Sequence, residues 1–211
     1  ATRTYTFDPL DDFQYLSEGE ELPLTFDYRV EDQSGNLSVE ATISLVVEGV
    51  NDETIASNNT INAVEDGSSV PDSVVISDAD DGDIYIYSIV ENLGAGEGSV
   101  TLNENDGSYE FDPGSDFQYL REEQPIEVDF TYKTTDQNGI DSNVATITIV
   151  VTGVNDPATP QDDALDAIED GGIVFSVLED PDDYDADSGD TYTYITVAGS
   201  QIDGEGNLDE G

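Results

Sequence analysis

The chain has 211 residues, enough for one large domain or two smaller ones, and its 50 Asp and Glu against 4 Lys and Arg give a formal charge of −46. This charge excludes nucleic acid and an anionic membrane surface as partners, because phosphate groups would repel the chain. No membrane insertion is expected, since no stretch approaches the roughly 18 apolar residues of a membrane span. Cys and His are absent, which excludes disulfides and disfavours zinc, copper and iron, whereas carboxylate and carbonyl oxygens favour calcium or magnesium.

Apolar residues alternate with polar ones in several short runs, which predicts half-buried β-strands. In chain order these runs are "LTFDYRV" at 24–30, "ATISLVV" at 41–47, "IYIY" at 84–87, "VDFTYKT" at 128–134 and "ATITIVV" at 145–151. Turn signals stand at 105–107 and 137–139, and Pro9, Pro113 and Pro125 mark strand edges. Because 36% of the residues are hydrophobic, we expect the chain to fold once its charge is neutralised.

An internal repeat organises the chain. "FDPLDDFQYL" at 7–16 returns as "FDPGSDFQYL" at 111–120, and "VEGVND" at 47–52 returns as "VTGVND" at 151–156, both with an offset of 104 residues. "DADDGD" at 78–83 returns as "DADSGD" at 185–190 with an offset of 107, so three residues are inserted around "LEDPDDY". About seven short strands per repeat predict an all-β, immunoglobulin-like β-sandwich in tandem, head to tail.

The phase of the repeat predicts three segments. Residues 1–54 hold the second half of a repeat, residues 55–158 a whole one, and residues 159–211 the first half of another. The missing phenylalanine of the last repeat would fall at position 218, and joining Gly211 to Ala1 places Phe7 at the same position. One interpretation is coincidence. The other is that neighbouring units complete one another head to tail in a longer polymer.

The acidic stretch at 78–83 predicts a calcium site, because closely spaced Asp side chains supply several of the six to eight oxygens that calcium takes. The stretch is not an EF-hand loop, since its glycine is fifth rather than sixth and a predicted strand follows it. The alternative is a solvated acidic turn of a salt-adapted protein.

The "VxGVND" strand exit, together with "EDG" and "DxDxGD" at the start of the next repeat, resembles the bacterial cadherin-like and VCBS-type repeats of large secreted surface adhesins. This resemblance covers essentially the whole chain. It implies a cadherin-like sandwich that binds calcium between consecutive domains, and an extracellular location, secreted or at the cell surface. Any export signal is then expected to lie outside these residues.

The resemblance also implies which residues bind the ion. For the first junction they are Glu18, Asn51, Asp52, Asp78, Asp80 and Asp136, for the second Glu65, Glu122, Asn155, Asp156, Asp185 and Asp187, and for a junction before the first Asp32. Asp83 and Asp190 are expected to cap the loop or to contact calcium through water. The sequences "LSEG" and "LREE" lack the aspartate of the family pattern.

Simpler interpretations stay open for several positions. Glu65-Asp66 and Glu169-Asp170 could form a plain turn before glycine, and Asp12 and Asp116 are interpreted as turn-capping residues rather than ligands. The aromatic residues Phe26, Tyr28, Phe130 and Tyr132 are interpreted as core and not as a platform for sugars.

We therefore predict a calcium-rigidified structural repeat of an extracellular adhesin or fibre, with neighbouring copies as partners. Glycans or surfaces are left open as partners of other parts of the parent protein. The alternative is a calcium-dependent carbohydrate-binding module, which the absence of Trp disfavours. An enzyme is not predicted, because the acids recur in every repeat and a catalytic pair, as in glycosidases, is normally unique.

Overall fold

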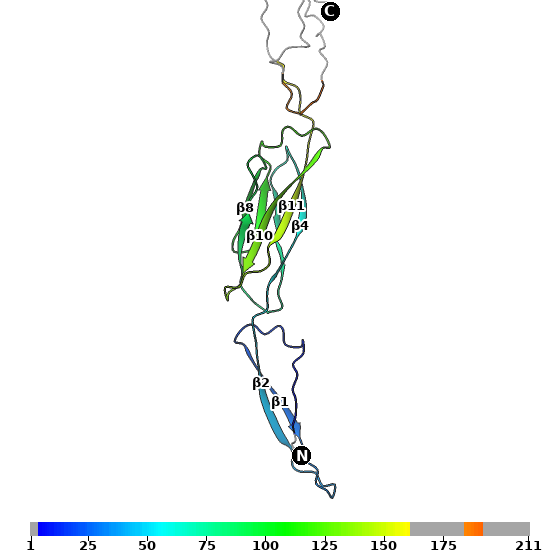
Figure 1. The fold of residues 1–211 in the computed structure, drawn as a ribbon, viewed down its shortest axis with the longest axis vertical. Helices are drawn as coiled ribbons and strands as arrows, with labels where there is room; N and C mark the ends of the chain where they lie inside the picture. The colour runs from blue at the N-terminus through cyan, green and yellow to red at the C-terminus, as the bar shows by residue number, and fades with distance from the viewer. Residues whose placement is uncertain (1–3, 161–183, 192–211) are drawn as a thin grey trace, which may run out of the picture.

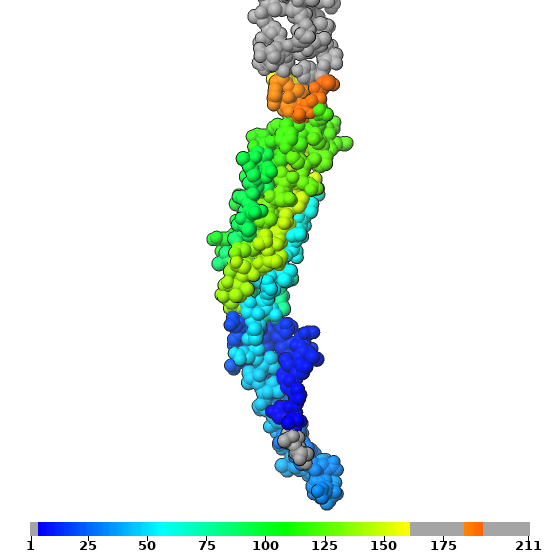
Figure 2. Space-filling model, viewed as in Figure 1, coloured from blue at the N-terminus to red at the C-terminus, as the bar shows by residue number. Residues whose placement is uncertain are grey.

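The computed structural model describes residues 4–160 and 184–191, which form an elongated all-β rod (Figure 1). A two-stranded hairpin lies at one end, a β-sandwich in the middle, and residues 184–191 at the other end. Figure 2 shows that the hairpin part is thinner than the sandwich. The described residues include no helix with the length and apolar character that a membrane crossing requires.

The hairpin pairs β1 (Glu21–Tyr28) with β2 (Ala41–Glu48) in antiparallel register. The sandwich contains β3 (Ile55–Ser57), β4 (Asn59–Val64), β5 (Val70–Ser73), β6 (Val75–Ser77), β7 (Ile86–Glu91), β8 (Ser99–Leu102), β9 (Ser108–Asp112), β10 (Pro125–Thr135) and β11 (Ala145–Thr152). The predicted all-β class is therefore confirmed. The predicted alternating runs overlap β1, β2, β7, β10 and β11, and the run at 84–87 overlaps β7 only from Ile86.

The sandwich has one four-stranded sheet, in the order β4-β11-β10-β7, and one three-stranded sheet, in the order β5-β9-β8. A short pair, β3 with β6, adds to them. All pairings are antiparallel except that β4 runs parallel to β11. The apolar side chains of the long strands meet between the layers, where Phe111, Phe130, Tyr132, Ile147 and Ile149 are fully buried.

Nine strand segments replace the seven that the sequence predicts, because two strands are interrupted and change partners. Asn58 separates β3 from β4, and its Oδ1 accepts a hydrogen bond from the Thr146 N–H at 2.8 Å. Val74 separates β5 from β6, and its N–H donates to the Gly107 carbonyl at 3.0 Å. At the breaks the partners change, because β4 pairs with β11 and β5 pairs with β9, whereas β3 and β6 pair with each other.

The glycine of the repeated "VxGVND" motif lets two backbone segments approach closely just before each linker, which is Asn51-Asp52 in the first repeat and Asn155-Asp156 in the second. A Cβ on Gly153 would lie 2.2 Å from the Arg121 carbonyl oxygen, and a Cβ on Gly49 would lie 2.2 Å from that of Ser17. A backbone oxygen cannot move away from a Cβ this close, so only glycine fits at these two positions. The turn that precedes β1 or β10 therefore packs directly on the start of the linker and fixes the position of Asn51 or Asn155.

The middle segment predicted at 55–158 contains β3 to β11, and the hairpin lies within the segment predicted at 1–54. Most of the predicted segment at 159–211 lies outside the described residues. The parts that are described, residues 159–160 and 184–191, are joined by a β-bridge between Thr159 and Tyr184.

Candidate metal sites at the two junctions

Three acidic side chains meet where the sandwich leads into the next repeat, at the second junction. Glu65 follows β4, Asp156 follows β11, and Asp187 belongs to the segment 184–191. One carboxylate oxygen of each lies within 4.8 Å of the other two. Glu65 is 1% exposed and Asp187 is 2% exposed. Carboxylates this close and this buried repel one another unless a cation or a proton neutralises them.

One oxygen of Glu65 and one oxygen of Asp187 each accept a backbone N–H, and the other oxygen of each has no partner among the described residues. Val154 N–H donates to Glu65 Oε1, and Asp156 N–H donates to Asp187 Oδ2 at 2.9 Å. Asp187 N–H donates to Asp185 Oδ1 at 3.0 Å, so Asp185 fixes the loop that presents Asp187. The backbone therefore orients the cluster without filling it.

Five buried carboxylate oxygens have no hydrogen-bond partner among the described residues. They are Glu65 Oε2, Asp156 Oδ2 and Asp187 Oδ1 at the second junction, and Asp80 Oδ1 and Asp83 Oδ2 at the first. Buried polar atoms are normally paired, so these oxygens indicate a ligand. A site of anionic oxygens alone fits calcium, which binds six to eight oxygen atoms and tolerates irregular geometry.

The electrostatics of the second junction agree with this interpretation. Burial raises the pKa of Glu65, and the nearby charges of Asp156, Asp66 and Asp187 raise it further. Burial likewise raises the pKa of Asp156, with contributions from Asp66, Asp187 and Asp185. Without a cation, the charged forms of these acids are disfavoured.

The remaining predicted residues of the second junction lie around the cluster. The side-chain amide of Asn155 donates to the backbone carbonyl of Asp156 at 3.0 Å. Asp190 Oδ1 lies 3.3 Å from Arg121 Nε, which also donates to the Ser188 carbonyl at 2.6 Å. Glu122 is exposed, and no contact among the described residues joins it to the cluster.

The first junction repeats the backbone arrangement of the second. Asp52 N–H donates to Asp80 Oδ2 at 2.7 Å, and Asp80 N–H donates to Asp78 Oδ1 at 3.1 Å. The Thr54 hydroxyl donates to Asp78 Oδ2 at 2.6 Å. Burial, followed by the charges of Asp80 and Asp78, raises the pKa of Asp52. The linker and the "DADDGD" loop therefore come together as predicted in sequence.

Asp136 ties the first linker to the sandwich. Its Oδ1 accepts the N–H groups of Asn138 and Ile140, each at 2.8 Å, and its Oδ2 accepts the Asn51 amide at 3.0 Å. Burial opposes the charge on Asp136, but these hydrogen bonds outweigh burial and lower its pKa. Asn51 therefore reaches from the linker of one repeat to a turn of the next.

Asp83 and Glu18 lie at the edge of the first junction. The Gln137 amide donates to Asp83 Oδ1 at 2.8 Å. Burial, and then the charges of acids including Asp80, raise the pKa of Asp83. Glu18 is exposed and lines a shallow pocket with Asn51.

Asp32 lies in the hairpin, at the turn equivalent to that of Asp136. Its Oδ1 accepts the N–H groups of Ser34 and Asn36, each at 2.8 Å, and its Oδ2 accepts the Asn36 amide at 2.9 Å. These hydrogen bonds, above all that of the Asn36 amide, lower the pKa of Asp32. Among the described residues, no linker asparagine contacts Asp32 as Asn51 contacts Asp136.

Sequence reasoning missed two residues at the junctions. Asp66, interpreted only as a turn residue, contributes negative charge to Glu65 and Asp156, and it accepts the Gln118 amide at 2.9 Å. Thr54 fixes Asp78, as described above. The doubled acid in "VEDG" was a signal for Asp66, whereas nothing in the sequence singles out Thr54.

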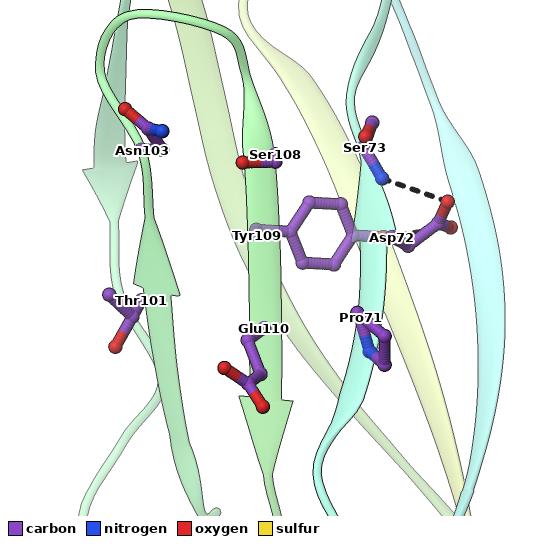
Figure 3. A pocket seen from close by; sticks show the side chains of 8 residues that line it. All are labelled: Pro71, Asp72, Ser73, Thr101, Asn103, Ser108, Tyr109 and Glu110. Carbon is purple, nitrogen blue, oxygen red and sulfur yellow. Dashed lines mark hydrogen bonds between the residues drawn. The ribbon is translucent and has the colours of Figure 1, made fainter.

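The pocket on the three-stranded sheet β5-β9-β8 does not provide a platform for sugars (Figure 3). It is lined by β5, β8 and β9, including Asp72, Thr101 and Glu110. Its one aromatic residue, Tyr109, is buried, and its hydroxyl donates to Asp72 Oδ2 at 3.3 Å. A buried ring cannot stack on a ligand, so this surface gives no support to a carbohydrate-binding module.

In EDTA, the stability of the sandwich should fall as pH rises above the ordinary glutamate value of 4.5. The reason is that a group whose folded-state pKa is raised contributes stability below its unfolded pKa and loses it as pH rises through the folded pKa. Thermal unfolding of the parent and of Glu65→Gln between pH 4 and 7 tests this, since the variant should lose less. Equal pH dependence would contradict the role of Glu65.

Comparison with known proteins gives one family match. Residues 51–153 match the sequence profile of the bacterial cadherin-like domain. None of the curated proteins compared with the chain matches it.

Similar solved structures are cadherin ectodomains. Human mucin-like protocadherin EC1-2 is 17% identical with a TM-score of 0.47, covering 71% of this chain and 72% of that one. Human desmocollin-1 ectodomain is 13% identical with a TM-score of 0.44, covering 70% of this chain and 28% of that one. Drosophila N-cadherin EC1-4 is 17% identical with a TM-score of 0.39, covering 64% of this chain and 34% of that one.

Proposed function

We propose that the chain, whose residues 51–153 match the bacterial cadherin-like domain, is a structural segment of an extracellular adhesin or fibre, stiffened by calcium at its junctions. The observation that supports this most is the cluster of Glu65, Asp156 and Asp187, acids from two successive repeats with one buried, unpaired oxygen each. A bound cation would join the repeats through these acids.

At the second junction we assign the clustered acids as calcium ligands, and at the first we assign acids of the linker and of the equivalent loop. At the second these are Glu65, Asp156 and Asp187, with Asp185 holding the loop. At the first they are Asp52, Asp80 and Asp83, with Asp78 and Asp136 holding the linker and the turn. Calcium would supply the positive charge that these acids lack, since the first junction has no ion pair among the described residues and the second has only that of Arg121.

The energy available from calcium is enough to change the stiffness of a junction. Extracellular calcium modules have dissociation constants of about 0.1–1 mM. At ~10 mM calcium, each site would stabilise the bound arrangement by roughly 1.4–2.7 kcal/mol. Removing the ion reverses this and leaves the acids to repel one another. The chain would then hold a distal part of the parent protein at a calcium-dependent distance.

A catalytic role is not proposed. Acids of the same kind recur at both junctions, whereas the acid and base of a catalytic site are normally unique. The negative surface instead keeps exposed strand edges from pairing wrongly.

Small-angle scattering in calcium and in EDTA tests the proposed function. We expect EDTA to shorten the maximum dimension or to raise the flexibility of the chain, because the junctions lose their bridging ion. A variant with Asp80→Asn and Asp187→Asn should give the EDTA-like profile even in calcium. Identical profiles in calcium and EDTA would contradict calcium stiffening.

A further inference from the structure

Each junction contains a second set of contacts, besides those between the acids and the linker. It joins the acid loop, residues 78–83 or 185–190, to the turn that carries the sequence "FQYL" and the residue after it in the preceding repeat, residues 13–17 or 117–121. We call this set the loop clamp. Its hydrogen bonds join backbone groups and a side-chain donor, so they do not require a cation.

At the first junction the loop clamp pairs both backbone groups of Asp81. The Asp81 N–H donates to the Tyr15 carbonyl at 3.1 Å, and the Asp81 carbonyl accepts the Ser17 hydroxyl at 3.1 Å. Ser17 is only 7% exposed, so its hydroxyl is largely shielded from water. A buried hydroxyl needs a partner, and here the partner belongs to the following repeat.

At the second junction the same two hydrogen bonds form with a different donor. Ser188 N–H donates to the Tyr119 carbonyl at 3.1 Å, and Arg121 Nε donates to the Ser188 carbonyl at 2.6 Å. These positions are the repeat equivalents of the three at the first junction, with arginine in the place of Ser17. A hydroxyl and a guanidinium share the ability to donate a hydrogen bond, so a donor is what the clamp requires at this position.

Each donor side chain also faces the last acid of its loop. Arg121 Nε lies 3.3 Å from Asp190 Oδ1. Burial raises the pKa of Asp83, and the Ser17 side chain opposes this rise. The equivalent acids Asp83 and Asp190 therefore meet side chains from equivalent positions of the preceding repeat.

The clamped residue directly follows the buried acid that meets the linker. Asp80 precedes Asp81, and Asp187 precedes Ser188. Linker N–H groups donate to Asp80 Oδ2 at 2.7 Å and to Asp187 Oδ2 at 2.9 Å, and the other oxygen of each acid is unpaired among the described residues. Consecutive Cα atoms are about 3.8 Å apart, so a clamp on one residue also restrains the acid beside it.

We propose that Ser17 and Arg121 are positioning residues of the two junctions. Through the loop clamp, each holds the acid loop of the following repeat against the preceding repeat before a cation binds. A loop that is already ordered loses less conformational entropy on binding. The clamp therefore raises the affinity of the junction for the cation.

The clamp matters most when no cation is present. The acids then repel one another, and the hydrogen bonds to Asp81 or Ser188 are left to keep the loop in place. In calcium, the ion and the clamp join the same two repeats, and each makes the other contact intramolecular. We therefore expect loss of the donor to loosen a junction in EDTA and to leave it nearly unchanged in saturating calcium.

Distances across the first junction test Ser17. The chain has no cysteine, so Val46→Cys and Val144→Cys, both at exposed positions, place one spin label on each side of the junction. Ser17→Thr and Ser17→Val add the same bulk and differ in the hydroxyl. In EDTA, electron–electron double resonance should give a narrow distance distribution for Ser17→Thr and a broad one for Ser17→Val. Calcium should narrow the distribution of Ser17→Val.

Ser38→Ala is the matched control, because the Ser38 hydroxyl donates to the Val39 carbonyl at 2.7 Å within one repeat. It should leave the distance distribution of the parent unchanged. Equal distributions for Ser17→Thr and Ser17→Val in EDTA would overturn the role of Ser17. If the added methyl group prevented folding, both variants would fail alike, and position 121 would decide.

At the second junction, Arg121→Gln and Arg121→Met form the test pair. Both remove the charge, but Gln places a nitrogen where Nε stands, whereas Met places a methyl group there. Isothermal titration should show weaker calcium binding by Arg121→Met than by Arg121→Gln, by about 2- to 12-fold, which corresponds to one hydrogen bond. Equal affinities of the two variants would overturn the role of Arg121.

The calcium titration rests on the proposed function, whereas the distances in EDTA do not. A broad distribution for Ser17→Val alone, with scattering of the parent unchanged by calcium, would support the clamp and overturn calcium stiffening. Stiffening by calcium, with equal distributions for Ser17→Thr and Ser17→Val, would do the reverse.

Discussion

Glu65→Gln should weaken calcium binding at the second junction by at least about tenfold. Mutating a residue that only supports a metal ligand lowers metal affinity by about 10–100-fold. Calcium affinity also depends on the number of charged ligands, so the loss of a ligand charge should weaken binding at least as much. The amide keeps the size of the side chain and an oxygen for the Val154 N–H, so the change removes mainly the charge. Isothermal titration with calcium measures the effect.

The same variant should be more stable than the parent in EDTA near neutral pH, because burial and neighbouring acids disfavour the charged form of Glu65. Glu122→Gln is the matched control, since Glu122 is exposed and has no described contact with the cluster. It should leave both properties nearly unchanged. If Glu122→Gln weakened binding more than Glu65→Gln, the ligand assignment of the second junction would be wrong.

Phe130→Ala should lower the free energy of unfolding of the sandwich by about 3–5 kcal/mol, the usual cost of removing a buried aromatic ring. Phe130 is fully buried and packs against Tyr109. The same substitution at the equivalent position, Phe26→Ala, should change the stability of the sandwich by less than about 0.5 kcal/mol in a single copy. Urea unfolding, followed by tyrosine fluorescence, compares the two variants. Equal effects of Phe26→Ala and Phe130→Ala on the stability of the sandwich would contradict the difference in burial between the two rings.

The strands of the fold could be predicted because their signal is local. The alternating runs at 41–47 and 145–151 lie within β2 and β11, almost to the residue. The run at 84–87 overlaps β7 only at its end, since β7 begins at Ile86. The parallel pairing of β4 with β11 joins residues about 90 positions apart, and no local pattern specifies such a pair.

The candidate site could be predicted as far as it follows the repeat. The family resemblance placed Asp52 with Asp80 and Asp156 with Asp187, and hydrogen bonds join both pairs in the fold. What the sequence could not supply was burial. Glu65 and Glu122 are equally acidic and both recur near turns, but only Glu65 follows a strand whose end is covered by the linker.

The ion pair between Arg121 and Asp190 makes the two joints of the rod unequal. In the first repeat Ser17 stands where Arg121 stands in the second, and the equivalent of Asp190, Asp83, meets the neutral Gln137. The guanidinium partly neutralises one joint when divalent ions are scarce, although a partly exposed pair contributes at most about 1 kcal/mol. As calcium declines, bending should therefore begin at Asn51 and Asp52 and reach the second joint later. The rod would yield in stages, one joint before the next.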